Sequence, residues 1–136
     1  MQDEKGEFVS ENGNKILVMD DEDIVAEIAK QMLNFLGYEV SVVENGEQAV
    51  TLYRQAHETG SPFSLVIMDL NIPQGMGGIE AVKQVLDIDK AAKVIVSSGY
   101  SSDPIMVDYA EYGFIGCIAK PFDLEGLKSA ISAAMV

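Results

Sequence analysis

The sequence has only one cysteine, Cys117, among its 136 residues. A single thiol excludes an internal disulfide and a metal site built from several cysteines. Long apolar runs are also missing: none approaches the roughly 18 residues of a transmembrane helix. Residues 1–14 are polar and acidic, and they lack the basic-then-apolar order of a secretory signal peptide. These absences together predict a protein of the reducing cytoplasm.

Basic residues are scarce. Nine Lys and Arg residues stand against 22 Asp and Glu residues, which gives a formal net charge of −13 at pH 7. Such an acidic field opposes direct binding to nucleic acid or to an anionic membrane, and it suits a partner with a basic or mixed surface. Hydrophobic residues make up 48% of the chain, which is enough for a core. The length predicts one domain at residues 15–136, preceded by a flexible segment or linker at residues 1–14.

The chain is organised around a stretch in which an apolar run leads directly into four acids. The run from Ile16 to Met19 is typical of a strand that is buried on both faces. The run from Asp20 to Asp23 follows at once, and four adjacent carboxylates repel one another and are costly to desolvate. A helix start explains about two of these acids. A hard divalent cation held by oxygen ligands explains the others better.

Short apolar segments alternate with amphipathic segments along the whole chain. The apolar segments, interpreted as strands, cover residues 15–20, 40–43, 63–68, 94–96 and 114–118, and the third and fourth end in Asp69 and in Ser97-Ser98-Gly99. The helical patterns begin near residues 24, 46, 79, 104 and 124, and the fourth is expected to run to about residue 113. Strands this apolar, separated by single helices, predict an α/β fold with a doubly wound, flavodoxin-like parallel sheet that helices cover on both faces.

In a sheet of this kind the ligand binds beyond the carboxyl ends of the strands. Here those ends carry Asp20, Asp21, Asp69, Ser98 and Lys120. Three carboxylates can bind Mg²⁺ and leave positions for waters and a phosphoryl oxygen. Asp69 stands alone at the end of the central strand and is the candidate nucleophile for an aspartyl-phosphate. Ser98 can donate a hydrogen bond to a phosphoryl oxygen, and Lys120 can neutralise its charge.

These motifs together resemble the receiver (response-regulator) domain of two-component signalling. The matching residues are Asp20-Asp21, Asp69, Ser98-Gly99 and Lys120-Pro121-Phe122. The resemblance covers about residues 15–136, and it implies five strands in the order 2-1-3-4-5 with five helices. It also implies that Asp69 accepts a phosphoryl group from the phosphohistidine of a sensor histidine kinase or a phosphotransfer protein.

The resemblance implies roles for the other site residues. Mg²⁺ would bind to Asp21, Asp69 and the main-chain carbonyl of Asn71, and Asp20 would be the outer acid of the metal site. Ser98 and Lys120 would hold the phosphoryl group. Such a domain catalyses only its own phosphorylation and dephosphorylation. It then signals by a conformational change to a downstream protein or a fused domain, which the sequence does not identify.

The resemblance also implies a backbone feature at strand five. We expect a cis peptide bond between Lys120 and Pro121, because the family turns the chain in this way to aim the lysine into the site. Three residues before Lys120, the family often has the Tyr or Phe of its switch, whereas this chain has Cys117. We therefore expect a smaller change around strand five on phosphorylation, carried mainly by the loop from Gly99 to Asp103 with Tyr100 as its reporter.

The loop at residues 73–78 is one residue longer than the commonest family pattern and resembles the receivers of hybrid sensor histidine kinases. An excised terminal receiver and a stand-alone protein both remain open. Three other functions are alternatives. A pseudo-receiver would be a protein-binding module that takes no phosphate. An aspartyl-phosphate phosphohydrolase needs a second acid where this chain has Asn71. A flavodoxin-type FMN carrier needs a phosphate loop where this chain has Asp20 to Asp23.

Overall fold

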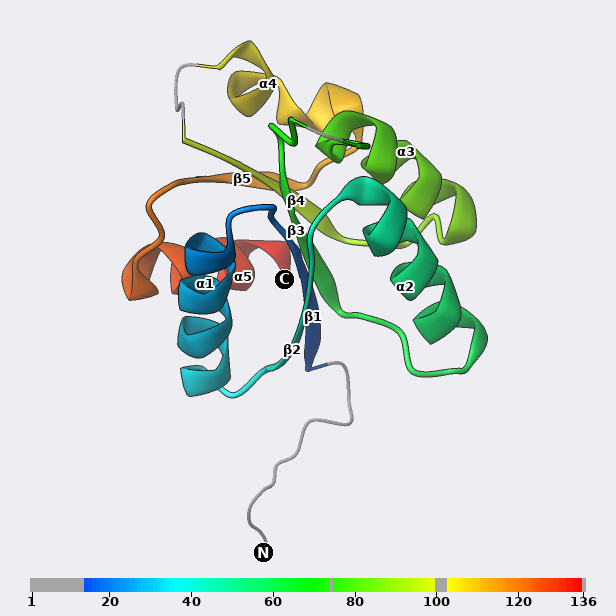
Figure 1. Cartoon of the computed structure of the whole chain (residues 1–136), viewed down its shortest axis with the longest axis horizontal. Helices are drawn as coiled ribbons and strands as arrows, with labels where there is room; N and C mark the ends of the chain where they lie inside the picture. Colours follow the sequence, from blue (N-terminus) through cyan, green and yellow to red (C-terminus); the bar gives the residue numbers. More distant parts are fainter. Residues whose placement is uncertain (1–13, 74, 100–102, 136) are drawn as a thin grey trace, which may run out of the picture.

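A computed structural model describes residues 14–73, 75–99 and 103–135 (Figure 1). The predicted linker lies outside these ranges except for its last residue, and so does the predicted reporter Tyr100. The strands are β1 (Lys15–Met19), β2 (Glu39–Val43), β3 (Leu65–Asp69), β4 (Val94–Ser98) and β5 (Gly116–Ala119). The α-helices are α1 (Asp23–Phe35), α2 (Gly46–Glu58), α3 (Gly78–Ile88), α4 (Pro104–Val107) and α5 (Leu124–Ala134), and a 3₁₀ helix, η1, spans Tyr109–Tyr112.

The strands form one parallel sheet in the order β2-β1-β3-β4-β5, which confirms the predicted architecture. Figure 1 shows α2 and α3 on one face of the sheet and α1 and α5 on the other. Because side chains alternate along a strand, each strand supplies both cores. Leu17 and Met19 pack with α2 and α3, whereas Ile16 and Val18 pack with α1 and α5. No helix among the described residues is both long and apolar enough to cross a membrane.

Capping residues mark several of the helix ends. The side chain of Asn45 accepts a hydrogen bond from the Gln48 N–H at 3.0 Å, which caps α2. Asp103 caps α4 in the same way, with Pro104 at the first helical position. After α1, Gly37 takes φ +101° and donates its N–H to the Asn34 carbonyl, so the chain turns sharply into β2.

The fourth helix is much shorter than the sequence pattern predicts. α4 ends at Val107, and the chain continues as the 3₁₀ helix η1 before Gly113 ends it at φ +102°. Val107 is β-branched and Asp108 competes for backbone hydrogen bonds, so both residues have low helix propensity. Gly113 also lies so close to α3 that a Cβ there would approach Leu86 Cδ1 to 2.7 Å. Cys117, on the strand β5 that follows η1, is exposed.

Tyr53 joins α2 to the segment after α3. Its ring is 1% exposed, and its hydroxyl donates a hydrogen bond to Asp89 Oδ2 at 2.8 Å. Burial raises the pKa of Tyr53 well above its usual value, and the hydrogen bond and the negative charge of Asp89 raise it further. A folded-state pKa above the unfolded value stabilises the native state below about pH 10, and this stabilisation is lost as the pH rises further.

Substitution of Tyr53 by Phe is therefore expected to have an effect that depends on pH. At neutral pH Tyr53→Phe should lower the free energy of unfolding by about 1 kcal/mol, because the hydrogen bond to Asp89 is lost. Above about pH 10 the wild type should lose stability more steeply than the variant, since only the wild type must keep this buried phenol protonated. Urea unfolding of both proteins at neutral pH and at about pH 11 measures the difference between their free energies of unfolding. A constant difference across that range would contradict the prediction.

Candidate functional site

The predicted site residues meet at the carboxyl edge of the sheet. Asp20 directly follows β1, Asp69 ends β3 and Ser98 ends β4. Lys120 directly follows β5, and its N–H donates a hydrogen bond to the Ser98 carbonyl at 2.9 Å. These residues lie far apart in the sequence, and they come together because parallel strands end at the same edge.

Asp20 and Asp69 make the same kind of hydrogen bond to the backbone. Asp20 Oδ1 accepts the Glu22 N–H at 2.9 Å, and Asp69 Oδ1 accepts the Asn71 N–H at 3.3 Å. Each side chain thus bonds its own backbone two residues further on, as Asp commonly does in turns. This leaves both Oδ2 atoms free to turn towards the interior of the site, where they meet Lys120.

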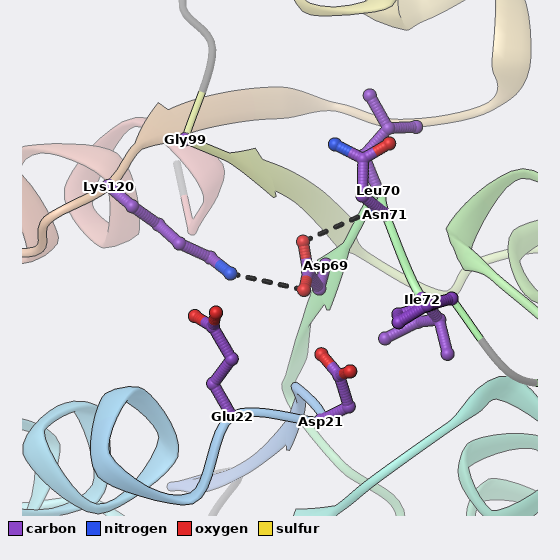
Figure 2. A pocket seen from close by; sticks show the side chains of 9 residues that line it. Asp21, Glu22, Asp69, Leu70, Asn71, Ile72, Gly99 and Lys120 are labelled. Atoms are coloured by element: carbon purple, nitrogen blue, oxygen red, sulfur yellow. Dashed lines mark hydrogen bonds and ion pairs between the residues drawn. The ribbon is translucent and has the colours of Figure 1, made fainter.

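Lys120 forms ion pairs with both aspartates. Its Nζ lies 2.7 Å from Asp20 Oδ2 and 3.1 Å from Asp69 Oδ2, and Figure 2 shows its side chain extending across the pocket to Asp69. The Lys120–Pro121 peptide bond is cis, which confirms the prediction. Phe122, two residues further, is buried in the core beneath α1 and α5. The chain on either side of Lys120 is therefore fixed, by β5 before it and by the buried Phe122 after it.

Burial and charge act in opposite directions on these groups. Burial raises the pKa of Asp69 above its usual value, although the hydrogen bond and charge of Lys120 partly oppose this. Burial by itself would lower the pKa of Lys120, but the hydrogen bonds and charges of Asp20 and Asp69 outweigh it, so that pKa lies above its usual value. Lys120 therefore stays protonated at neutral pH.

Three carboxylates form a group with the geometry of a metal site. Asp20, Asp21 and Asp69 each offer one oxygen, and these three oxygens lie within 4.8 Å of one another. Asp20 and Asp69 are buried, and Lys120 supplies one positive charge against three negative charges. Hard oxygen ligands with an excess of two negative charges fit Mg²⁺, which binds to few carboxylates and keeps several waters.

A pocket of about 640 Å³ opens above these groups. Its lining includes Asp21, Asp69, Asn71 and Lys120, so the residue whose carbonyl is predicted to bind the metal lies at the same pocket. Glu22 also lines it, and in Figure 2 its carboxylate lies across from the lysine ammonium. Glu22 is not among the site residues predicted from the sequence, although its position in the acidic run from Asp20 to Asp23 was the available signal.

Ser98 and Ser97 have different surroundings. Both are buried, and the Ser97 hydroxyl donates to the Met68 carbonyl at 3.4 Å, within the sheet. The Ser98 hydroxyl lies 3.5 Å from Asn71 Nδ2, on the side of the loop that follows Asp69. Of the two serines, Ser98 is therefore the one in contact with the loop at the pocket.

A doubly wound sheet with acids at the ends of β1 and β3 and a lysine at the end of β5 defines a class, the phospho-accepting signalling domains. The chain belongs to the response regulator receiver domain family, which matches residues 16–132. The chemotaxis protein CheY of Bacillus subtilis is 33% identical over 123 residues, covering 90% of this chain and 98% of that protein. Sporulation initiation phosphotransferase F of Bacillus subtilis is 31% identical over 117 residues, covering 86% of this chain and 90% of that protein.

Solved structures have the same architecture. One is a response regulator protein from Burkholderia pseudomallei, described with a phosphorylated aspartic acid, a calcium ion and citrate. It is 25% identical with a TM-score of 0.73, and the match covers 86% of this chain and 65% of that one. The family, the fold and the coarse function as a phospho-accepting receiver domain in two-component signalling thus agree with the sequence analysis.

Proposed function

We propose that Asp69 is the phospho-acceptor of this receiver domain and takes its phosphoryl group from a phosphohistidine donor. The observation that carries the proposal is the group of Asp20, Asp21 and Asp69 oxygens within 4.8 Å, with Lys120 paired to two of these acids. In the transfer, the bond from phosphorus to the imidazole nitrogen breaks as a bond from phosphorus to an Asp69 oxygen forms. The imidazole leaves with the electron pair and takes up a proton from solvent.

Each residue of the site contributes positioning or charge to this step. The Asn71 N–H donates a long hydrogen bond of 3.3 Å to Asp69 Oδ1, which contributes to orienting the carboxylate. Lys120 moves from neutralising Asp69 to neutralising the new phosphoryl oxygens, at a distance its side chain already spans. Ser98 donates a hydrogen bond to a second phosphoryl oxygen. These groups act by electrostatics, as phosphoryl transfer requires.

Mg²⁺ is the proposed cofactor. Asp21, Asp69 and the main-chain carbonyl of Asn71 would bind it directly, and Asp20 would accept hydrogen bonds from its waters. When bound, it supplies positive charge to the phosphoryl oxygens. The Burkholderia pseudomallei regulator is described with both a phosphorylated aspartic acid and a calcium ion, which supports a divalent cation as a companion of aspartate phosphorylation.

The donor is proposed to be a sensor histidine kinase or a phosphotransfer protein. The domain, at residues 15–136 after a linker at residues 1–14, is proposed to act in the cytoplasm and to signal through a downstream protein or a fused domain. It would catalyse only its own phosphorylation and dephosphorylation. Similarity to the sporulation initiation phosphotransferase of Bacillus subtilis supports a role for this domain in a series of phosphoryl transfers between proteins.

Intact mass after incubation with acetyl phosphate and Mg²⁺ tests the proposal. We expect one phosphoryl group per chain, lost on mild alkaline treatment as acyl phosphates are, and absent when EDTA replaces Mg²⁺. An unmodified mass under all conditions would favour the pseudo-receiver alternative. Continuous release of phosphate from unrelated phosphate esters, at many turnovers per chain, would favour the phosphohydrolase alternative.

Mg²⁺ is also expected to stabilise the native state by mass action. At a free concentration ten times its dissociation constant, the gain is about 1.4 kcal/mol. Asp21→Asn should raise the stability of the metal-free protein, because it relieves repulsion among the three acids, and should weaken Mg²⁺ binding. Thermal unfolding across a Mg²⁺ titration measures both effects, with Asp87→Asn on the exposed side of α3 as control. A melting temperature independent of Mg²⁺ would count against the metal site.

A further inference from the structure

The loop between β3 and α3 returns to the strand end from which it leaves. A Cβ added to Gly78 would lie 3.0 Å from the Asp69 carbonyl oxygen, and one added to Gly77 would lie 3.2 Å from the Leu70 carbonyl oxygen. The two glycines therefore let the backbone pack directly on the backbone beside Asp69. The segment between these points includes Asn71, which lines the pocket.

The outer end of this loop is held by the first turn of α2. The Gly46 N–H donates to the Met76 carbonyl at 2.7 Å, and the Met76 N–H donates to Glu47 Oε1 at 3.0 Å. Both backbone groups of Met76 are thus bonded by neighbouring residues of another element. Gly75, at φ +92°, lies so close that a Cβ there would be 3.1 Å from Glu47 Oε1.

The contact leaves no space at Gly46. A Cβ there would lie 2.6 Å from Met76 Cγ, 2.8 Å from Met76 Cβ and 2.8 Å from the Met76 carbonyl oxygen. A flexible side chain could move away, but the carbonyl oxygen belongs to the loop backbone. Inside the loop, by contrast, the bond from the Asn71 N–H to Asp69 Oδ1 is long, at 3.3 Å, and so restrains the loop weakly.

We propose that Glu47, together with Gly46, is a positioning residue for the phosphorylation site. It fixes Met76, and through the adjoining Gly77 and Gly78, which pack on the carbonyls of Leu70 and Asp69, it holds the main chain around Asn71 beside Asp69. Glu47 touches neither the phosphoryl group nor the metal. The inference rests on the proposed roles of Asp69 and of the Asn71 carbonyl, and it adds α2 to the elements that set the affinity for the cation.

Variants at Glu47 separate the hydrogen bond from the charge. Glu47→Ala removes the acceptor for the Met76 N–H and is expected to raise the dissociation constant for Mg²⁺ roughly tenfold, the usual order for outer partners of metal sites. Glu47→Gln keeps an oxygen that can accept the same bond and is expected to bind Mg²⁺ nearly as the wild type does. Glu58→Ala removes an exposed acid at the other end of α2 and is the matched control.

The measurements are Mg²⁺ titration by calorimetry, the rate of phosphorylation by acetyl phosphate at saturating Mg²⁺, and urea unfolding. Glu47 is exposed, so its variants are expected to fold. Gly46→Ala should weaken Mg²⁺ binding further than Glu47→Ala, because its new methyl group meets the loop backbone itself. Alanine has a higher helix propensity than glycine. If Gly46→Ala acted only on α2 and not on the loop, it would therefore leave Mg²⁺ binding unchanged.

Two results would overturn the proposal. If Glu47→Ala and Glu47→Gln weakened Mg²⁺ binding equally, the effect would be due to the charge of Glu47 and not to its hydrogen bond. If Glu47→Ala left Mg²⁺ binding unchanged, Glu47 would have no role beyond the start of α2. Either result, in a wild type that binds Mg²⁺ and takes a phosphoryl group, leaves the proposed function intact. A wild type that does neither would refute the proposed function and this inference with it.

Discussion

Asp69→Asn is expected to abolish the labile phosphoryl adduct that acetyl phosphate and Mg²⁺ form with the wild type. The amide has nearly the shape of the carboxylate, but it has no anionic oxygen to form an acyl phosphate. The substitution keeps the fold, because Lys120 retains its ion pair with Asp20 at 2.7 Å. The loss is therefore one of chemistry, and intact mass before and after alkaline treatment measures it.

The free energy of unfolding of Asp69→Asn is not expected to fall, although its phosphorylation is lost. Because burial raises the pKa of Asp69 in the native state, its charged form opposes folding at neutral pH. That penalty is present above the folded-state pKa and disappears as the pH falls below the unfolded value near 4. Asp69→Asn should thus be at least as stable as the metal-free wild type at neutral pH. A labile adduct that persists in Asp69→Asn, or an alkali-stable adduct on a serine such as Ser98, would refute the assignment of the acceptor.

Lys120→Ala is expected to produce the largest loss of stability among these variants in the absence of Mg²⁺. Lys120 is paired with two acids whose side chains are 2% and 5% exposed, Asp20 and Asp69. Its removal leaves two buried carboxylates facing each other, and breaking a buried pair from one side typically costs roughly 3–5 kcal/mol. Mg²⁺ should restore part of the lost stability, since it supplies positive charge to the same carboxylate oxygens.

Urea unfolding with and without Mg²⁺ measures both effects, and Lys128→Ala, at an exposed lysine of α5, is the control. The difference between wild type and Lys120→Ala should shrink below about pH 4, where the carboxylates take up protons. Phosphorylation of Lys120→Ala should still depend on Mg²⁺, but the conformational response should be largely lost. Equal stability of the two proteins at neutral pH without Mg²⁺ would contradict the role of the ion pairs.

The sequence predicts the sheet and the meeting of the site residues well, because both depend on strong local signals. Buried strands such as β1 and β3 are continuous apolar runs, and the polar residue after each run marks the strand end. Parallel pairing then places Asp20, Asp69 and Ser98 at one edge without further information.

Contacts between distant turns were not predictable in the same way. The bonds between Met76 and the first turn of α2 join residues about 30 positions apart, and neither segment has a periodic pattern that identifies the other. The length of α4 was overestimated, since its cap at Asp103 is a strong signal whereas the low helix propensity of Val107 and Asp108, where it ends, is a weak one. The pairing of Lys120 with Asp20, besides Asp69, also depends on side-chain geometry that spacing does not contain.

The exposed thiol on the edge strand β5 allows the wild-type chain to be labelled chemically at a single position. Cys117 is the sole cysteine of the chain, and it lies on β5 three residues before the lysine of the site. A maleimide dye or a nitroxide would therefore attach at one position with one-to-one stoichiometry, and no cysteine would have to be removed or introduced. Conformational exchange at the edge of the sheet can then be followed optically or by electron paramagnetic resonance, in a protein whose native sequence is unchanged.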